Sequence, residues 1–283
     1  MDTQCVTSII NTRIMVELFL LPFFQRALLV GLLLGILLAT LGVIVVLRRM
    51  SFFADAIGHS ALTGIALGIL LEVNPFLAAL AFTLLVALVI SIVRERTELH
   101  LDTLLGIFFP TAVAIGVILI QRTPGYQTDL INILFGDILT VSTFDVIASI
   151  ILSGIVLVSL AIAGKRLLTI TLDPDLAHTE GIPVALYELI LLLILAAVIA
   201  LTIKLVGILL VTAMMIIPAA TAQNTARSMV AMFSISIVVS IIATTTGMLS
   251  SAALNVPSGP AIVLAAAVLF ALSLVSRSFM VGR

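Results

Sequence analysis

The feature that most constrains this chain is the repetition of long apolar stretches without an interrupting charge. The first of them, Ala27 to Leu47, has no charged side chain at all. A helix needs about 20 such residues to cross the hydrocarbon core of a bilayer. Backbone polar groups in lipid must be hydrogen-bonded within the protein, which favours helices. Barrel strands would alternate in polarity, and no segment here does. The sequence therefore predicts an all-α integral membrane protein.

The composition supports this class and excludes others. Of the 283 residues 62% are apolar and only 10% are charged, and the mean hydropathy is +1.39. Soluble domains are close to half apolar and a quarter charged. The net charge of −1 predicts no nucleic-acid partner, because such partners require a basic face. The single Cys5 can form no intrachain disulfide and belongs to no cysteine–histidine metal motif.

Apolar stretches between charged or turn residues predict about eight or nine membrane spans. Only Lys204 separates the sixth stretch from the seventh, so eight spans with one broken helix is the alternative to nine. The connection from Arg122 to Ser142 is half apolar and is expected to hold a short helix outside or dipping into the membrane. The nine predicted stretches are 27–47, 55–71, 75–93, 103–121, 144–163, 184–203, 205–222, 229–250 and 260–276.

The whole chain, residues 1–283, is expected to form a single transmembrane domain with no separate soluble part. Residues 1–26 have no small-residue cleavage site behind their apolar run, which argues against a cleaved signal peptide. We interpret them as an amphipathic lead-in that lies at the membrane interface before the first span.

The distribution of Lys and Arg predicts the orientation, because cytoplasmic loops retain these residues. An N-terminus outside and a C-terminus inside the cytoplasmic membrane places most of them in the cytoplasm. The outside would then hold Arg13, Arg26, Arg122 and Lys204. The inside would hold Arg48, Arg49, Arg94, Arg96, Lys165, Arg166, Arg227, Arg277 and Arg283.

Asp55 and His59 are the leading candidates for a functional site, because ionisable side chains within spans are costly unless they have partners or face water. Their four-residue spacing places them on one helical face. A carboxylate with an imidazole suits zinc, manganese or iron, and an incomplete site suits a pore, where the metal must also leave. The alternative is structural: Asp55 caps the helix and His59 donates a hydrogen bond to a neighbouring helix.

Other polar or sulfur-containing side chains can be explained by ordinary structural roles as well as by a role in the metal pathway. Asp102 begins another span and is either a capping residue or a weaker candidate for the metal pathway. His100 is expected to be a solvated surface residue, and Lys204 to extend to the outer interface. Met214 and Met215 could line a path for a soft metal, but methionine more often fills gaps in a core.

Motifs for covalent chemistry are absent from the sequence. Neither the GxxxxGK[ST] phosphate loop, nor HExxH, nor GxSxG is present. The chain is therefore predicted not to be an enzyme and to hold no permanent cofactor, and its energy must come from a partner or an ion gradient. An ion-gradient secondary transporter would need coupling residues within the spans, and these are almost lacking; an intramembrane enzyme would need a catalytic set that is not found.

A series of motifs resembles the permease subunits of the bacterial zinc/manganese/iron ABC importers, from about Leu21 to Ser276. In order they are RRMSFFADAIGHSALTGIALG, LDTLLGI, LFGDIL, LVGILLVTAMMIIPAATA and LNVPSGPAIVLAAAVLF. The resemblance implies the fold of type II (vitamin B12-type) importers. It also implies that a divalent metal passes between two copies of this chain. Two cytoplasmic ATPase subunits would power the transport, and an extracytoplasmic metal-binding protein would deliver the metal.

The resemblance further implies roles for particular residues. Asp55 and His59 match the family's Asp and His that contact the permeating metal. The loop after PAATA resembles the ATPase-docking segment, with the stretch DPDLAHTEGIPV beside it. After His59 the sequence SALTG departs from the HAVLPG pattern of manganese members and is more similar to the zinc-uptake branch. The docking loop comprises Gln223, Asn224, Thr225, Ala226, Arg227, Ser228 and Met229.

Overall fold

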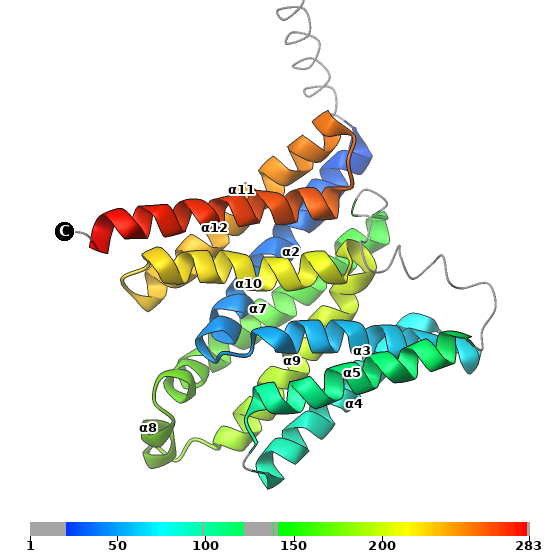
Figure 1. Cartoon of the computed structure of the whole chain (residues 1–283), viewed down its shortest axis with the longest axis vertical. Coiled ribbons are helices and arrows are strands. Elements are labelled where there is room, and N and C mark those ends of the chain that lie inside the picture. Colours follow the sequence, from blue (N-terminus) through cyan, green and yellow to red (C-terminus); the bar gives the residue numbers. More distant parts are fainter. Residues whose placement is uncertain (1–20, 98, 122–137, 139–140, 282–283) are drawn as a thin grey trace, which may run out of the picture.

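The computed structural model describes residues 21–97, 99–121, 138 and 141–281. The described chain folds into long helices joined by short connections (Figure 1). The helices are α2 (Pro22–Leu47), α3 (Ser51–Leu70), α4 (Pro75–Arg96), α5 (Leu101–Gln121), α7 (Thr143–Leu172), α8 (Pro174–Thr179), α9 (Val184–Val206), α10 (Ile208–Thr225), α11 (Met229–Leu254) and α12 (Ser258–Val281).

Nine of the helices within the described residues are long and apolar enough to cross a membrane, all except the six-residue α8. The prediction of an all-helical protein that spans the membrane many times is thereby confirmed, with nine candidate spans. Residues 1–20, most of the expected lead-in, and most of the expected outer helix at 122–142 lie outside the described residues. The first span begins at Pro22, which places Pro22–Arg26 in the helix instead of the lead-in.

Polar contacts define the two ends of the bundle. At one end, contacts join the last residues of α2, α4 and α7 to the start of α9, and α8 lies there; we call it the α8 end. At the opposite end, contacts join the first residues of α2, α4 and α7 to the end of α9. Since only three residues separate the end of α2 from the start of α3, Asp55 and His59 lie in the half of α3 nearer the α8 end.

The break between the sixth and seventh spans lies at Gly207, and the boundary predicted at Lys204 was wrong. Gly207 has a φ of 79° and ψ of 161°, a conformation that side chains with a Cβ rarely adopt. The helix therefore continues through Lys204 to Val206 before the chain turns. The two helices have different neighbours, because α9 packs mainly on α4 and α3 whereas α10 packs on α2, α11 and α12.

The longest helix is α7, which ends at Leu172 instead of near residue 163. Its 30 residues correspond to about 45 Å, more than the hydrocarbon thickness of about 30 Å. Lys165 and Arg166, expected in a loop, are therefore on the last turns of the helix. Asp173 is the C-cap of α7 and also the N-cap of α8, because its side chain accepts a hydrogen bond from the Leu176 amide.

Small residues allow the helices to approach closely. A Cβ at Gly42 of α2 would lie 1.8 Å from the carbonyl oxygen of Met215 in α10, so the two backbones are in contact there. Ser236 Oγ of α11 donates a hydrogen bond to the Ala39 carbonyl of α2 at 3.0 Å. One turn away, Ser240 of α11 lies against Gly35 of α2. The spacing of four residues on both helices keeps this contact in register.

Candidate functional site

Asp55 and His59 are adjacent on one face of α3, as their spacing predicts. His59 Nδ1 lies 3.6 Å from Asp55 Oδ1 and 3.0 Å from the main-chain carbonyl oxygen of Asp55. The side chains remain accessible, with 44% of Asp55 and 26% of His59 exposed in a single chain. A carboxylate and an imidazole are thus presented together on an open face, where an ion or a second protein can reach them.

The contacts of His59 determine which of its nitrogens is available to a metal. If Nδ1 donates its proton to the Asp55 carbonyl, Nε2 carries the lone pair and is the metal-binding nitrogen. The ring also packs edge-to-face on Phe109 of α5, with 5.0 Å between the ring centroids and an interplanar angle of 86°. Phe109 therefore restrains the imidazole. Phe109 was not a candidate from the sequence, although it lies just after the quoted stretch LDTLLGI.

The structural alternative for Asp55 and His59 does not fit this geometry. Helix α3 begins at Ser51 with Met50 as its N-cap, so Asp55 lies more than one turn inside and caps nothing. His59 makes its polar contacts to Asp55 of its own helix, and its neighbour on α5 is an aromatic ring.

The small residues of α3 serve close packing. A Cβ at Gly64 would lie 2.6 Å from the Ala79 Cα of α4, and one at Gly68 would lie 2.7 Å from the Pro75 Cα. These two glycines hold α4 against α3. They leave the face with Asp55 and His59 as the accessible one.

The other titratable candidates remain separate from this pair. Asp102 is exposed in the first turn of α5, where its negative charge interacts favourably with the helix dipole. His100 is exposed just before that helix, as expected for a surface residue. Among the described residues no group of three or more His, Cys, Asp or Glu side chains could hold a metal ion. Asp55 and His59 thus bring together two donor side chains within one chain.

An ion-pair network links four helices at the α8 end of the bundle. Glu188 of α9 accepts from Arg48 at 3.3 Å with one oxygen and from Arg94 of α4 at 3.1 Å with the other. Arg48 also donates to Thr171 Oγ1 of α7 at 2.9 Å. Burial lowers the pKa of the Arg48 guanidinium, and the Glu188 carboxylate opposes that shift. Glu188 is a lone acid near the start of an apolar stretch, and no sequence pattern predicted its role.

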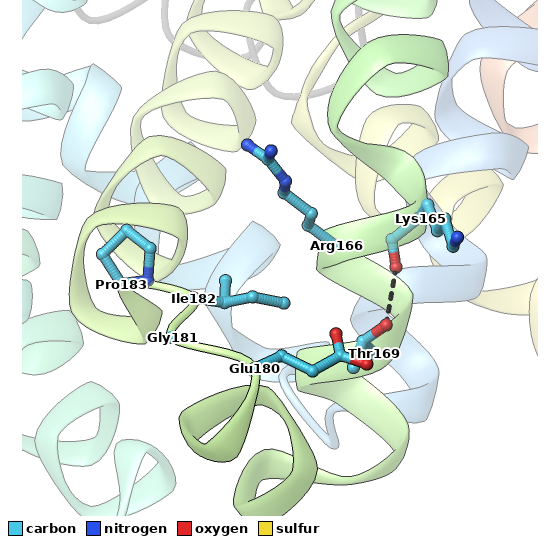
Figure 2. Close-up of a pocket in the computed structure, with 7 residues that line it drawn as sticks. All are labelled: Lys165, Arg166, Thr169, Glu180, Gly181, Ile182 and Pro183. Atoms are coloured by element: carbon cyan, nitrogen blue, oxygen red, sulfur yellow. Dashed lines mark hydrogen bonds between the residues drawn. The ribbon is translucent and has the colours of Figure 1, made fainter.

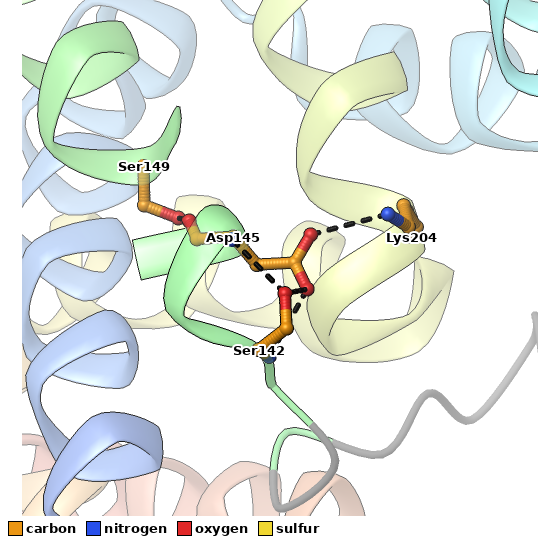
Figure 3. Close-up of polar contacts among 4 residues, drawn as sticks. All are labelled: Ser142, Asp145, Ser149 and Lys204. Carbon is orange, nitrogen blue, oxygen red and sulfur yellow. Dashed lines mark hydrogen bonds and ion pairs between the residues drawn. The ribbon is translucent and has the colours of Figure 1, made fainter. Parts of the chain in front are cut away.

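An exposed polar cluster lies at the opposite end (Figure 3). Lys204 Nζ, near the end of α9, lies 3.1 Å from Asp145 Oδ1 in the first turn of α7. Asp145 also accepts from the amide and the hydroxyl of Ser142, and its own amide donates to Ser142 Oγ, which forms a capping box. Lys204 lies over the ring of Phe76 in α4. Lys204 is therefore paired, whereas the sequence predicted only that it reaches the interface.

The predicted docking loop Gln223–Met229 is shorter in the structure, because Gln223 to Thr225 belong to α10 and Met229 to α11. Helix α10 ends at Thr225, and α11 begins at Met229 with the Ser228 hydroxyl as its N-cap. Gln223, Arg227 and Ser228 are exposed. Met214 and Met215, by contrast, are buried within the bundle, as expected for methionine that fills gaps in a core.

Nine candidate spans among the described residues, with an accessible carboxylate–imidazole pair, are typical of a multi-pass membrane transport protein. The chain belongs to the ABC 3 transport family, whose pattern it matches over residues 20–277. It is therefore the membrane permease of an ABC transport system and not its ATPase. The family assignment confirms the resemblance identified from the ordered motifs.

Named relatives and a solved structure agree with this family. The chain is 40% identical to the high-affinity zinc uptake system membrane protein ZnuB of Haemophilus influenzae, over 89% of this chain and 96% of that protein. It is 36% identical to the manganese import system permease protein ScaB of Streptococcus gordonii, over 89% of both. The structure of PsaBC from Streptococcus pneumoniae in complex with Fab is similar, with a TM-score of 0.80 and 34% identity over 92% of this chain and 94% of that chain.

Proposed function

We propose that this permease imports zinc or manganese across the cytoplasmic membrane and that Asp55 and His59 contact the metal on its way. The observation that carries the proposal is the exposed carboxylate beside the imidazole on one face of α3. These donors suit divalent transition metals. The relatives include both a zinc system and a manganese system, and the sequence after His59 favours zinc.

Two copies of the chain would place two such pairs around one path. A single chain supplies two ligands, fewer than the four that zinc usually takes. A second Asp55–His59 pair, or water, would complete the coordination. Because each pair is exposed, the second copy can approach it without rearrangement of α3. A partly completed site also allows the metal to dissociate towards the cytoplasm.

The α8 end is assigned to the cytoplasm, because the described Lys and Arg side chains concentrate there. This end holds Arg48, Arg49, Arg94, Arg96, Lys165, Arg166 and Arg227, and the opposite end holds Arg26 and Lys204. A cytoplasmic ATPase would dock on Gln223–Met229 with α8 beside it. An extracytoplasmic binding protein would deliver the metal at the opposite end.

Metal uptake by vesicles that contain the permease with its ATPase tests the site. We expect Asp55→Asn and His59→Gln each to reduce uptake of zinc or manganese at least about tenfold, because each removes one of two ligands. His100→Gln is the matched control, since this histidine is exposed outside the spans. Asp102→Asn decides between helix capping, which leaves uptake unchanged, and a role in the pathway.

The same vesicles distinguish an importer from an ion-gradient transporter. Uptake should require ATP and should persist when ionophores collapse the proton and sodium gradients. Uptake by the permease alone, driven by a gradient, would overturn the proposal. Normal uptake by the Asp55→Asn, His59→Gln double variant would overturn the site assignment alone.

A further inference from the structure

A polar cavity lies between α7 and the segment that joins α8 to α9 (Figure 2). Its volume is about 380 Å³, and it opens to the surface of the chain. Lys165, Arg166 and Thr169 of α7 line one side, and Glu180 to Pro183 line the other. In Figure 2 the Arg166 side chain extends towards α9, while the Glu180 carboxylate extends towards Thr169 from below.

The cavity is lined by the cations Lys165 and Arg166 and by the anion Glu180, and no ion pair joins Arg166 to Glu180 within the described residues. Arg166 donates to the Tyr187 hydroxyl and lies over its ring, which fixes the guanidinium in place. Among the described residues its other guanidinium nitrogens make no hydrogen bond or ion pair, so they can donate to an anion. Within the described part of the chain, Glu180 makes no ion pair. The two charges are therefore available to a ligand that carries both signs.

The face of α7 above the cavity is exposed and apolar. Ile155, Val158 and Ile162 project from it, and Ile162 is 79% exposed. Helical periodicity places Arg166 and Thr169 on the same face, further towards the α8 end. An acyl chain that lies along the apolar stripe would therefore bring its headgroup to Arg166.

The order of the two charges matches that of one class of lipid. Arg166 is six residues before the end of α7, which places it about 9 Å closer to the membrane centre than Leu172. The Glu180 carboxylate lies beside Thr169, nearer that end of α7 than Arg166 (Figure 2). In phosphatidylethanolamine the phosphate is attached to the glycerol and the ammonium lies further out. The phosphate would meet Arg166, and the ammonium would meet Glu180.

We propose that this cavity binds the headgroup of a phosphatidylethanolamine molecule, with its phosphate on Arg166 and its ammonium on Glu180. The inference is independent of the metal site, because it uses neither Asp55 nor His59. It requires only that the chain lies in a bilayer. Basic pockets between membrane helices are a known way of binding lipid headgroups, and the facing acid adds selectivity for a headgroup with a primary ammonium.

Native mass spectrometry of the permease–ATPase complex, extracted from vesicles of phosphatidylethanolamine and phosphatidylglycerol, tests the proposal. Arg166→Gln should reduce the retention of both lipids about tenfold, because it removes the phosphate contact. Glu180→Gln should abolish the preference for phosphatidylethanolamine while phosphatidylglycerol is still retained. Phosphatidylcholine should compete poorly, because its ammonium has no hydrogen to donate.

A control variant and a competing ion distinguish lipid binding from a simple anion site and from a contact with the ATPase. Asp175→Asn removes an exposed acid of α8 that is not among the residues lining the cavity, and this variant should retain the lipid. Release of the lipid by inorganic phosphate alone would show a simple anion site and overturn the proposal. Loss of the ATPase subunit from Arg166→Gln with unchanged lipid would identify a protein contact instead and overturn it as well.

Discussion

Arg48 and Glu188 are 140 positions apart in the sequence, and their side chains form an ion pair of 3.3 Å at the α8 end of the bundle. Only 8% of the Arg48 side chain is exposed. Its Nη2 is buried and has no hydrogen-bond partner among the described residues. The pair with Glu188 is therefore the main compensation for a guanidinium that has lost most of its water.

Removal of Glu188 should destabilise the fold strongly. Glu188→Ala leaves Arg48 buried without its carboxylate, and such changes cost about 3–5 kcal/mol. Thermal unfolding of the detergent-solubilised permease should show a lowered midpoint. Glu95→Ala, which removes an exposed acid at the same end, is the control and should change the midpoint little. Equal midpoints for the two variants would contradict the role assigned to the Arg48–Glu188 pair.

The ion pair at the opposite end should contribute much less. Lys204 is 45% exposed, and exposed pairs are typically worth less than about 1 kcal/mol. A double-mutant cycle with Lys204→Met and Asp145→Asn measures the coupling energy between the two side chains. A coupling above about 2 kcal/mol would mean that this end of the bundle is shielded from water.

Helix packing predicts opposite effects for two glycine substitutions. Gly42→Ala places a Cβ 1.8 Å from a backbone oxygen of α10, so α2 and α10 must separate; we expect a loss of about 1–3 kcal/mol or more. Gly154→Ala on α7 meets nothing within 4 Å and should be neutral or stabilising by up to about 1 kcal/mol, from helix propensity. Expression level and thermal midpoint report both. A tolerated Gly42→Ala would contradict the close approach of α2 and α10.

The assigned orientation predicts which loops are labelled from each side. In a Cys5→Ser background, a cysteine at Arg227 should react with a membrane-impermeant maleimide only from the cytoplasm. A cysteine at Val73, in the turn between α3 and α4 at the opposite end, should react only from outside. The reverse pattern would invert the orientation and leave the fold unchanged.

The spans were predictable because each needs only a local run of apolar residues. Their ends were not predicted as well. Lys165 and Arg166 suggested the end of a span, yet α7 continues to Leu172, since long cationic side chains can reach water from within a helix. The sequence Asp173-Pro174 marks the true end, which capping rules could have identified. Gly207 was overlooked because Lys204 was the more conspicuous interruption.

Part of the candidate site was also predictable, because it depends on a local pattern. A spacing of four residues places Asp55 and His59 on one face of any helix. Their exposure and the contact with Phe109 depend on how α5 and α4 pack against α3, which no local pattern contains. The glycines of α3 were compatible both with close packing and with space for an ion. The structure places Gly64 and Gly68 against the backbone of α4.

The sequence by itself determined that this chain is a bundle of membrane helices that carries one carboxylate–imidazole pair, because apolar length and helical periodicity are local properties. Only the tertiary structure decided which charges meet. Arg48 pairs with Glu188, and Lys204 with Asp145, because of the order and rotation of helices that are distant in sequence. In a chain with so few charges these long-range pairs could not be read from spacing, since they depend on which helices become neighbours.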